Sequence, residues 1–208
     1  MRMPIERFEG IASAASTLQF ELSDGAALLP RLWFISPDGS ELVQLQRDWF
    51  ARNWRQTESS SASYPLYPAA RGAFERDLRK VAKVLGPLRP LQAEITYINH
   101  IDDPDIAAVL TSLNRVHTGG TPEFQGYNSQ YVLTRDGAHL GRLYLQAQKA
   151  LRRTSGEGLT VLTITVRGAP MGDGIDGALR FLDLGNEEAL VAFIQATRPA
   201  LHKKWSSG

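Results

Sequence analysis

The polar side chains best suited to chemistry are concentrated in two short segments of the sequence. The first segment ends in Trp54 and Arg55, and the second contains Glu94, Tyr97, Asn99 and His100. A guanidinium binds carboxylates and other anions through paired hydrogen bonds, and an imidazole can add a further contact. If the two segments form neighbouring strands, Arg55 meets Glu94. The pair then lies either in a polar pocket on an open sheet face or in a buried ion pair that fixes strand register.

Carboxylates and imidazoles follow closely after the second segment, which raises the question of a metal site. Four acidic residues and no Lys or Arg lie between positions 94 and 105, with His100 among them and His117 beyond. The spacing matches neither an HExxH motif nor an EF-hand loop. Asp102 or Asp103 is also explained as the cap of a short helix that starts at Pro104. We therefore expect no metal ion and no cofactor.

Nucleophilic catalysis has little support in the sequence. The chain contains no Cys, and it has no G-x-S-x-G nucleophile elbow. The glycine-rich run 171–177 lacks the Gly-Lys-Ser/Thr of a phosphate-binding loop, so we interpret it as a connection. An unrecognised hydrolase, assembled from distant residues, remains a third hypothesis.

Basic side chains gather on one predicted helix between Pro68 and Gly86. Residues 71–89 hold six basic and two acidic residues, an excess of four positive charges. Such a helix either binds nucleic-acid phosphates or is simply a solvated helix face. The residues concerned are Arg71, Arg76, Arg79, Lys80 and Lys83.

Overall composition excludes several other classes of protein. The 208 residues have a formal net charge of +1, so no global field draws the chain to nucleic acid. No run of about 18 apolar residues is present, so we expect no membrane-spanning helix. The charged N-terminus has no apolar core of a secretory signal, so we expect a cytoplasmic protein.

The elements that must position these residues follow from apolar periodicity and turn residues. In the first half we predict a hairpin of 32–35 and 42–46, a turn at Arg47-Asp48, and a strand over 49–55. The turn is needed because Phe50 and Trp54 otherwise fall on the opposite side from Val43 and Leu45. A polar linker over 58–63 and a helix from Pro68 to Leu85 follow, and then a strand over 91–98.

The second half is predicted to begin with a turn-rich stretch over 118–122. A hairpin of 131–134 and 140–146 follows, and then strands over 160–166 and 179–184. Asn186 is predicted to cap a helix that buries Leu190, Phe193, Ile194, Thr197 and Leu201, with a kink or restart at Pro199.

These elements indicate an α+β protein with a meander-rich, mostly antiparallel sheet and helices on one face. We expect a single domain over 1–208. The two Asp-Gly hairpins align at an offset of 98 residues, which favours two pseudo-repeated halves, 1–117 and 118–208, each a meander followed by a helix.

Specific motifs also link the chain to other proteins. The sequence resembles a sporadically distributed, uncharacterised bacterial family through Asn53-Trp54-Arg55, Tyr64-Pro65-Leu66-Tyr67 and the run 94–101. The segments 181–185 and 201–205 also look like that family's ending. The resemblance implies no established activity. The family's patchy distribution is typical of mobile elements and of defence-type gene neighbourhoods.

We therefore expect a non-catalytic binding module that recognises a protein partner, as an accessory of a bacterial defence or regulatory system. The expected recognition surface is the sheet face with Trp54, Arg55, Glu94, Tyr97, Asn99 and His100. The alternative is a nucleic-acid-binding accessory protein that uses the basic helix over 71–89.

Overall fold

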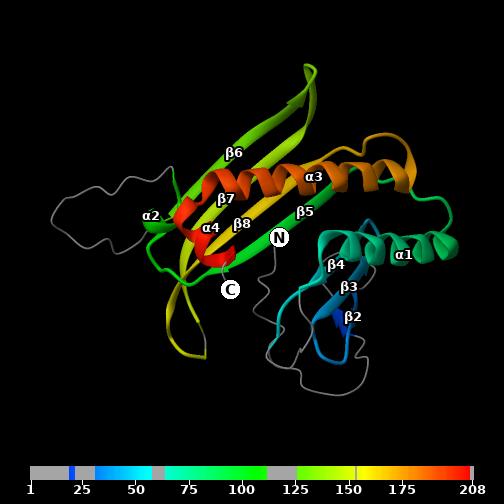
Figure 1. The fold of residues 1–208 in the computed structure, drawn as a ribbon. Coiled ribbons are helices and arrows are strands. Elements are labelled where there is room, and N and C mark those ends of the chain that lie inside the picture. Colours follow the sequence, from blue (N-terminus) through cyan, green and yellow to red (C-terminus); the bar gives the residue numbers. More distant parts are fainter. Residues whose placement is uncertain (1–18, 22–30, 58–63, 112–125, 153, 207–208) are drawn as a thin grey trace. The chain divides into compact units, whose positions relative to one another are not determined.

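The protein is described by a computed structural model that covers residues 19–21, 31–57, 64–111, 126–152 and 154–206 (Figure 1). The chain divides into two compact units, Met1–Val84 and Leu85–Gly208. Each unit has its own four-stranded antiparallel sheet, so the predicted α+β class is confirmed with two sheets in place of one. The boundary between the units lies at residue 84, well before the predicted midpoint at 117.

The N-terminal unit is a meander followed by one long helix. Its strands are β1 (Gln19–Glu21), β2 (Arg31–Ile35), β3 (Glu41–Gln46) and β4 (Trp49–Trp54), which lie in sequential order. Helix α1 (Tyr67–Leu85) is followed by Gly86, whose φ of 88° suits a residue without a Cβ. The predicted hairpin, third strand and helix are confirmed, whereas β1 was not predicted.

The two-residue turn at Arg47-Asp48 resolves the apolar phase of this meander. Because Gln46 pairs with Trp49, Leu45 lies opposite Phe50 and Val43 lies opposite Arg52. These side chains share the sheet face that packs on α1, where the rings of Phe50 and Phe74 meet edge to face at 5.2 Å. The predicted change of phase at residues 47–48 is confirmed.

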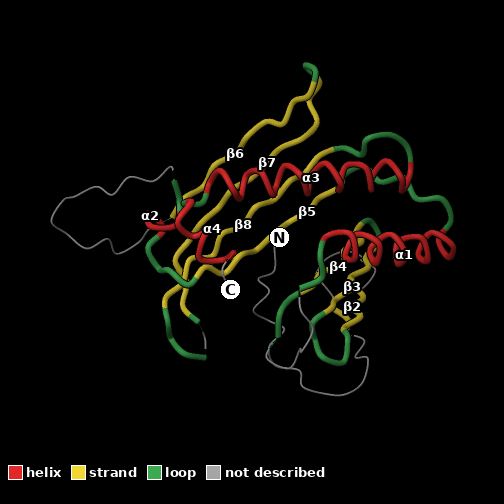
Figure 2. Tube along the Cα trace, viewed as in Figure 1, coloured by secondary structure: helices red, strands yellow, loops and turns green. Residues whose placement is uncertain are grey.

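The C-terminal unit contains longer strands in a different order. Strands β5 (Ala93–Ile101), β8 (Gly158–Gly168), β7 (Ala138–Leu151) and β6 (Gly126–Arg135) are neighbours in that order. Helices α2 (Ile106–Val109), α3 (Gly174–Ala196) and α4 (Pro199–Ser206) complete the unit. Figure 2 shows α3 running along β5 and β8, the two strands that it contacts most.

Glycines allow α3 to approach the sheet closely. A Cβ added to Gly168 would lie 2.5 Å from the Phe181 ring and 2.2 Å from the Leu140 carbonyl oxygen. A Cβ added to Gly185 would lie 2.9 Å from Ile95. The fully buried Phe181 therefore rests directly on strand backbone, and this contact determines which sheet face the helix covers.

The predicted strand over 179–184 is wrong, because these residues belong to α3. Ala178, Phe181, Leu182, Gly185 and Ala189 are buried at spacings of three and four residues, the period of a helix. Consequently, Asn186 is not a cap. It lies in mid-helix, and α3 begins within the predicted connection, at Gly174.

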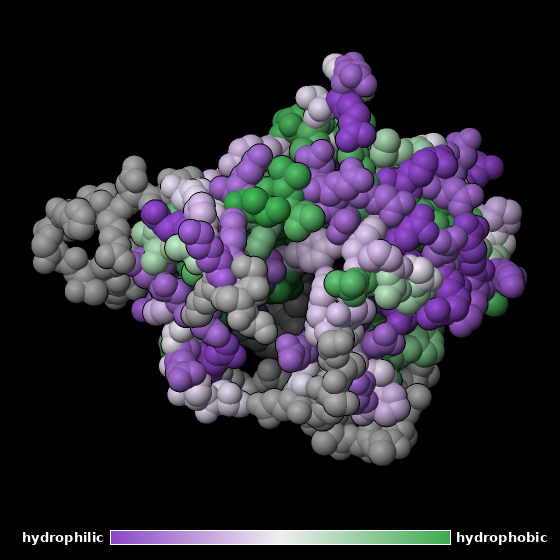
Figure 3. Space-filling view, viewed as in Figure 1, coloured by the Kyte–Doolittle hydropathy of each residue, from purple (hydrophilic) through white to green (hydrophobic). Residues whose placement is uncertain are grey.

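Several smaller predictions are also corrected. Helix α2 is capped by Asp105, whose carboxylate accepts from the Ala107 N–H at 3.0 Å, and not by Asp102 or Asp103. Leu190 and Ile194 are more than half exposed, so they are not buried as predicted, and Figure 3 shows apolar surface over α3. The predicted restart at Pro199 is confirmed. The linker over 58–63, the turns over 118–122 and His117 lie outside the described residues.

The C-terminal end of α3 is fastened to α2. Leu110 forms a bridge with the fully buried Thr197, and the Arg198 Nε donates to the Ala107 carbonyl at 3.0 Å. The Thr197 hydroxyl also bonds to the Phe193 carbonyl at 2.6 Å and to the His202 Nε2 at 2.7 Å. One threonine thus joins α2, α3 and α4.

Each unit has four strands followed by a long helix, although the C-terminal unit adds α2 and α4 and the two sheets differ. In each, an Asp-Gly turn joins the second and third strands, and a fourth strand precedes the long helix. The turns are not equivalent, because Asp136 and Gly137 both have positive φ, whereas at Asp38-Gly39 only the glycine does. The duplication stays a prediction.

Among the described residues, no helix combines the length and the apolar character that crossing a bilayer requires.

The surroundings of two glycines predict opposite effects of their replacement by alanine. Gly168→Ala should lower the free energy of unfolding by roughly 2–3 kcal/mol, because the new methyl group overlaps Phe181 and the Leu140 carbonyl. Gly72→Ala, on open helix surface with nothing within 4 Å, should raise it by about 1 kcal/mol. Urea denaturation followed by circular dichroism measures both, and equal stability of the two variants would contradict the packing described.

Candidate functional site

Trp54 and Arg55 make their contacts within the N-terminal unit. The Arg55 Nε donates to the Gly39 carbonyl at 3.2 Å, and the Arg55 N–H donates to the Ser40 carbonyl at 2.9 Å. The Trp54 ring meets Tyr64 edge to face at 5.0 Å. Arg55 therefore holds the turn between β2 and β3, together with Thr57, whose hydroxyl donates to the Asp38 carbonyl at 3.0 Å.

Glu94 lies in the other sheet and pairs with a different arginine. Its carboxylate accepts from the Arg167 Nε on the adjacent strand β8, where the two residues are direct register partners. The strands that precede Arg55 and contain Glu94 belong to different sheets. The prediction that these two strands are neighbours is therefore wrong, and Glu94 pairs with Arg167.

The four site residues of β5 point alternately to its two faces. Tyr97 and Asn99 lie on the face that α3 covers, where the Tyr97 hydroxyl donates to the Asn186 Oδ1 at 2.7 Å. The Asn99 amide donates to the Leu162 carbonyl at 3.3 Å. Glu94 and His100 lie on the opposite face and are exposed. The structure thus separates Glu94 and His100 from Tyr97 and Asn99.

The face away from α3 is continuous across all four strands of the C-terminal sheet. Strand register places Thr96 beside Thr165 and Tyr144, and Ile98 beside Thr163 and Gln146. We call this surface the polar face; its members are Glu94, Thr96, Ile98, His100, Asn128, Gln130, Val132, Arg142, Tyr144, Gln146, Gln148, Val161, Thr163, Thr165 and Arg167.

Contacts within the polar face order its centre. The Arg167 guanidinium lies 5.7 Å from the centre of the Tyr144 ring while it binds Glu94. The Thr96 and Thr165 hydroxyls share a hydrogen bond of 2.9 Å, and Thr165 is buried between its neighbours. Ile98 and Val132 expose 44% and 57% of their surface. This arrangement presents ordered aromatic, cationic and apolar groups on one side of the sheet.

Sequence reasoning missed Arg167, Tyr144 and Gln146. The signal was present in the alternation of 163–167, where every second side chain is polar, but finding it required the pairing order of the strands.

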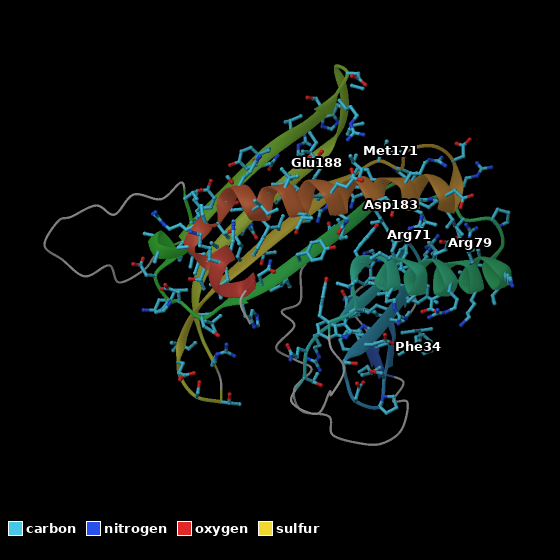
Figure 4. The ribbon with its side chains drawn as sticks, viewed as in Figure 1. Phe34, Arg71, Arg79, Met171, Asp183 and Glu188 are labelled. Atoms are coloured by element: carbon cyan, nitrogen blue, oxygen red, sulfur yellow. The ribbon has the colours of Figure 1, made fainter. Side chains whose placement is uncertain are left out.

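The basic side chains of α1 are largely engaged within the N-terminal unit. Glu75 binds Arg71 at 2.5 Å and Arg79 at 2.8 Å, and Asp77 binds Lys80 at 3.4 Å. Figure 4 shows Arg71 and Arg79 projecting from this helix. Arg76 and Lys80 nevertheless keep 61% and 68% of their side-chain surface exposed. These contacts weaken the phosphate-binding potential of the helix without abolishing its positive excess.

Arg52 forms a largely buried ion pair in the N-terminal unit. Its guanidinium reaches Asp77 on α1 at 2.5 Å and Glu41 on β3 at 2.7 Å, with 13% of the side chain exposed. The side chain therefore joins the helix to two strands.

The acidic residues that follow β5 make local contacts. Among the described residues, no group of three or more potential ligands is placed to bind a metal ion. Asp102 pairs with Arg152, and the Asp103 carboxylate accepts from the Asp105 N–H at 2.9 Å. An open depression of about 680 Å³ beside the β7–β8 turn is lined by Asp102, Arg152, Thr154, Ser155, Glu157 and Gly158.

Comparison with known proteins found no matching family model, no matching curated protein and no matching solved structure.

The Arg52 contacts predict unequal costs for two charge deletions in the N-terminal unit. Arg52→Met should lower the free energy of unfolding by roughly 2–3 kcal/mol, because Asp77 loses a charged partner in a largely buried position. Arg79→Met should cost about 0.5 kcal/mol, since its pair is exposed and Glu75 keeps Arg71.

Tryptophan fluorescence during urea denaturation distinguishes these outcomes. Three of the four tryptophans, Trp33, Trp49 and Trp54, belong to the N-terminal unit and report on its unfolding. Similar losses in both variants would show that Arg52 has no special role.

Proposed function

We propose that this protein is a non-catalytic binding module that recognises a protein partner through the polar face of its C-terminal sheet. The observation that supports the proposal is the asymmetry of that sheet. Helix α3 packs on one face, while the other presents side chains from all four strands. An antiparallel sheet needs only one covered face to be stable, so the second is available for recognition.

The composition of the polar face suits a protein better than a small molecule. Tyrosine and arginine dominate the energetics of protein interfaces, and Tyr144 is already ordered against Arg167. Ile98 and Val132 add exposed apolar surface among polar neighbours, as in the mixed surface of a non-obligate interface. Small-molecule sites are concave pockets, whereas the polar face is one side of a four-stranded sheet.

Within this proposal, Glu94 and His100 are retained as binding residues at one edge of the surface. Tyr97 and Asn99 instead hold β5 to α3 and to β8. The bacterial family that the sequence resembles suggests the setting, an accessory role in defence or regulation.

Nucleic-acid binding through α1 is a second candidate, favoured by the exposure of Arg76 and Lys80. Against it stands the internal pairing of the helix, in which Glu75 and Asp77 each bind more than one cation. Phosphate contacts formed there must compete with these pairs.

Site-specific photo-crosslinking tests the proposed surface. A benzoyl-phenylalanine at Tyr144, in the centre of the polar face, should crosslink to one protein of defined mass in the native cell. The same group at Leu190, which is 57% exposed on α3, should not yield that product. The additional substitution Ile98→Asp should remove the Tyr144 product, because it places a charge in the apolar part of the surface.

Two results would contradict the proposal. One is an equal product from Tyr144 and Leu190. The other is a Tyr144 product that disappears on nuclease treatment, which would indicate that the protein binds nucleic acid.

A further inference from the structure

Strand β6 is an edge strand with an outer side that no described strand occupies. In the order β5-β8-β7-β6 it pairs only with β7, through ten residues from Gly126 to Arg135. Figure 1 shows it as the outermost strand of the C-terminal sheet. The outer backbone groups of such a strand are a template for one more strand.

This edge lacks the devices with which proteins usually block edge pairing. From Gly126 to Thr134 the strand contains no Lys, Arg, Asp, Glu or Pro. Its register shift lies at Leu133/Thr134, near one end, and leaves the centre regular. At that centre Tyr131 and Val132 expose 49% and 57% of their surface.

The opposite edge, β5, carries charge in and after the strand. Glu94 lies on β5, where it pairs with Arg167, and Asp102, Asp103 and Asp105 follow the strand. The β6 centre has no charged side chain, so two copies of it meet without like-charge repulsion and without burial of a charged group. Charge therefore distinguishes the two edges of this sheet.

We propose that β6 pairs with β6 of a second copy of this chain, antiparallel about a twofold axis at Gln130. This register centres the uncharged segment on itself and sets Ser129 opposite Tyr131 and Asn128 opposite Val132. Residues of the same face then meet, as antiparallel pairing requires. The two four-stranded sheets become one sheet of eight strands, and the polar faces of both copies form one continuous surface.

The absence of cysteine permits a direct test of the register. Gln130→Cys introduces the sole thiol of the chain, and directly opposed residues of an antiparallel pair lie within disulfide-forming distance. Under oxidised glutathione we expect rapid formation of a covalent dimer. The matched control Gln148→Cys, on the same face but on β7, should remain uncrosslinked because the twofold axis places its two copies far apart.

Sedimentation equilibrium of the unmodified protein provides the second measurement. We expect a reversible dimer, and Gln130→Lys should weaken its association by about fivefold or more, because two like charges oppose each other at the axis. Gln148→Lys should leave the association constant unchanged, and thermal unfolding verifies that both variants fold. A monomer at every concentration, or equal crosslinking of the two cysteine variants, overturns the proposal.

Discussion

The close contact between α3 and the C-terminal sheet is the constraint on which the rest of that unit depends. At Gly168 the Phe181 ring rests on backbone, and at Gly185 the helix backbone approaches Ile95 and Val166. Because α3 lies so close to the sheet, the side chains that point toward it from the strands beneath are buried or partly buried. Because side chains alternate along a strand, the residues between the buried ones must emerge on the other side. The polar face follows from that alternation.

The N-terminal unit depends on charge to a greater degree. Arg52 lies at the junction of β3, β4 and α1, and it satisfies Glu41 and Asp77 together. Asp77 in turn binds Lys80, and Glu75 binds two arginines. Positive and negative residues are nearly balanced over the whole chain. The same is true locally on α1, where basic side chains form ion pairs with acidic side chains of the same helix. A sequence count of basic residues overstates the field that such a helix presents.

Local patterns predicted much of the fold, and long-range relations account for what they missed. The turn at Arg47-Asp48 was predictable because a change of apolar phase must be resolved within one strand's length. The segment 179–184 was not, because a glycine at its end and closely spaced apolar residues fit a short strand as well as a buried helix turn. The prediction that Arg55 and Glu94 lie on neighbouring strands was wrong because a single sequence does not show how many sheets its strands form. Capping by Asp105 was missed for a simpler reason, since three neighbouring aspartates fit the same role.

The pairing of β5 with β8 has a consequence for folding during synthesis of the chain. Ile101 pairs with Thr160, so about sixty residues must be synthesised after β5 before its partner exists. At a translation rate of about 5–20 residues per second, this strand waits for seconds without a sheet to join. Strands β6, β7 and β8 face no such delay, because each is next in the chain to a strand with which it pairs. Charges in or next to an unpaired strand disfavour its association with other strands, and Glu94, Asp102, Asp103 and Asp105 lie in β5 and just after it.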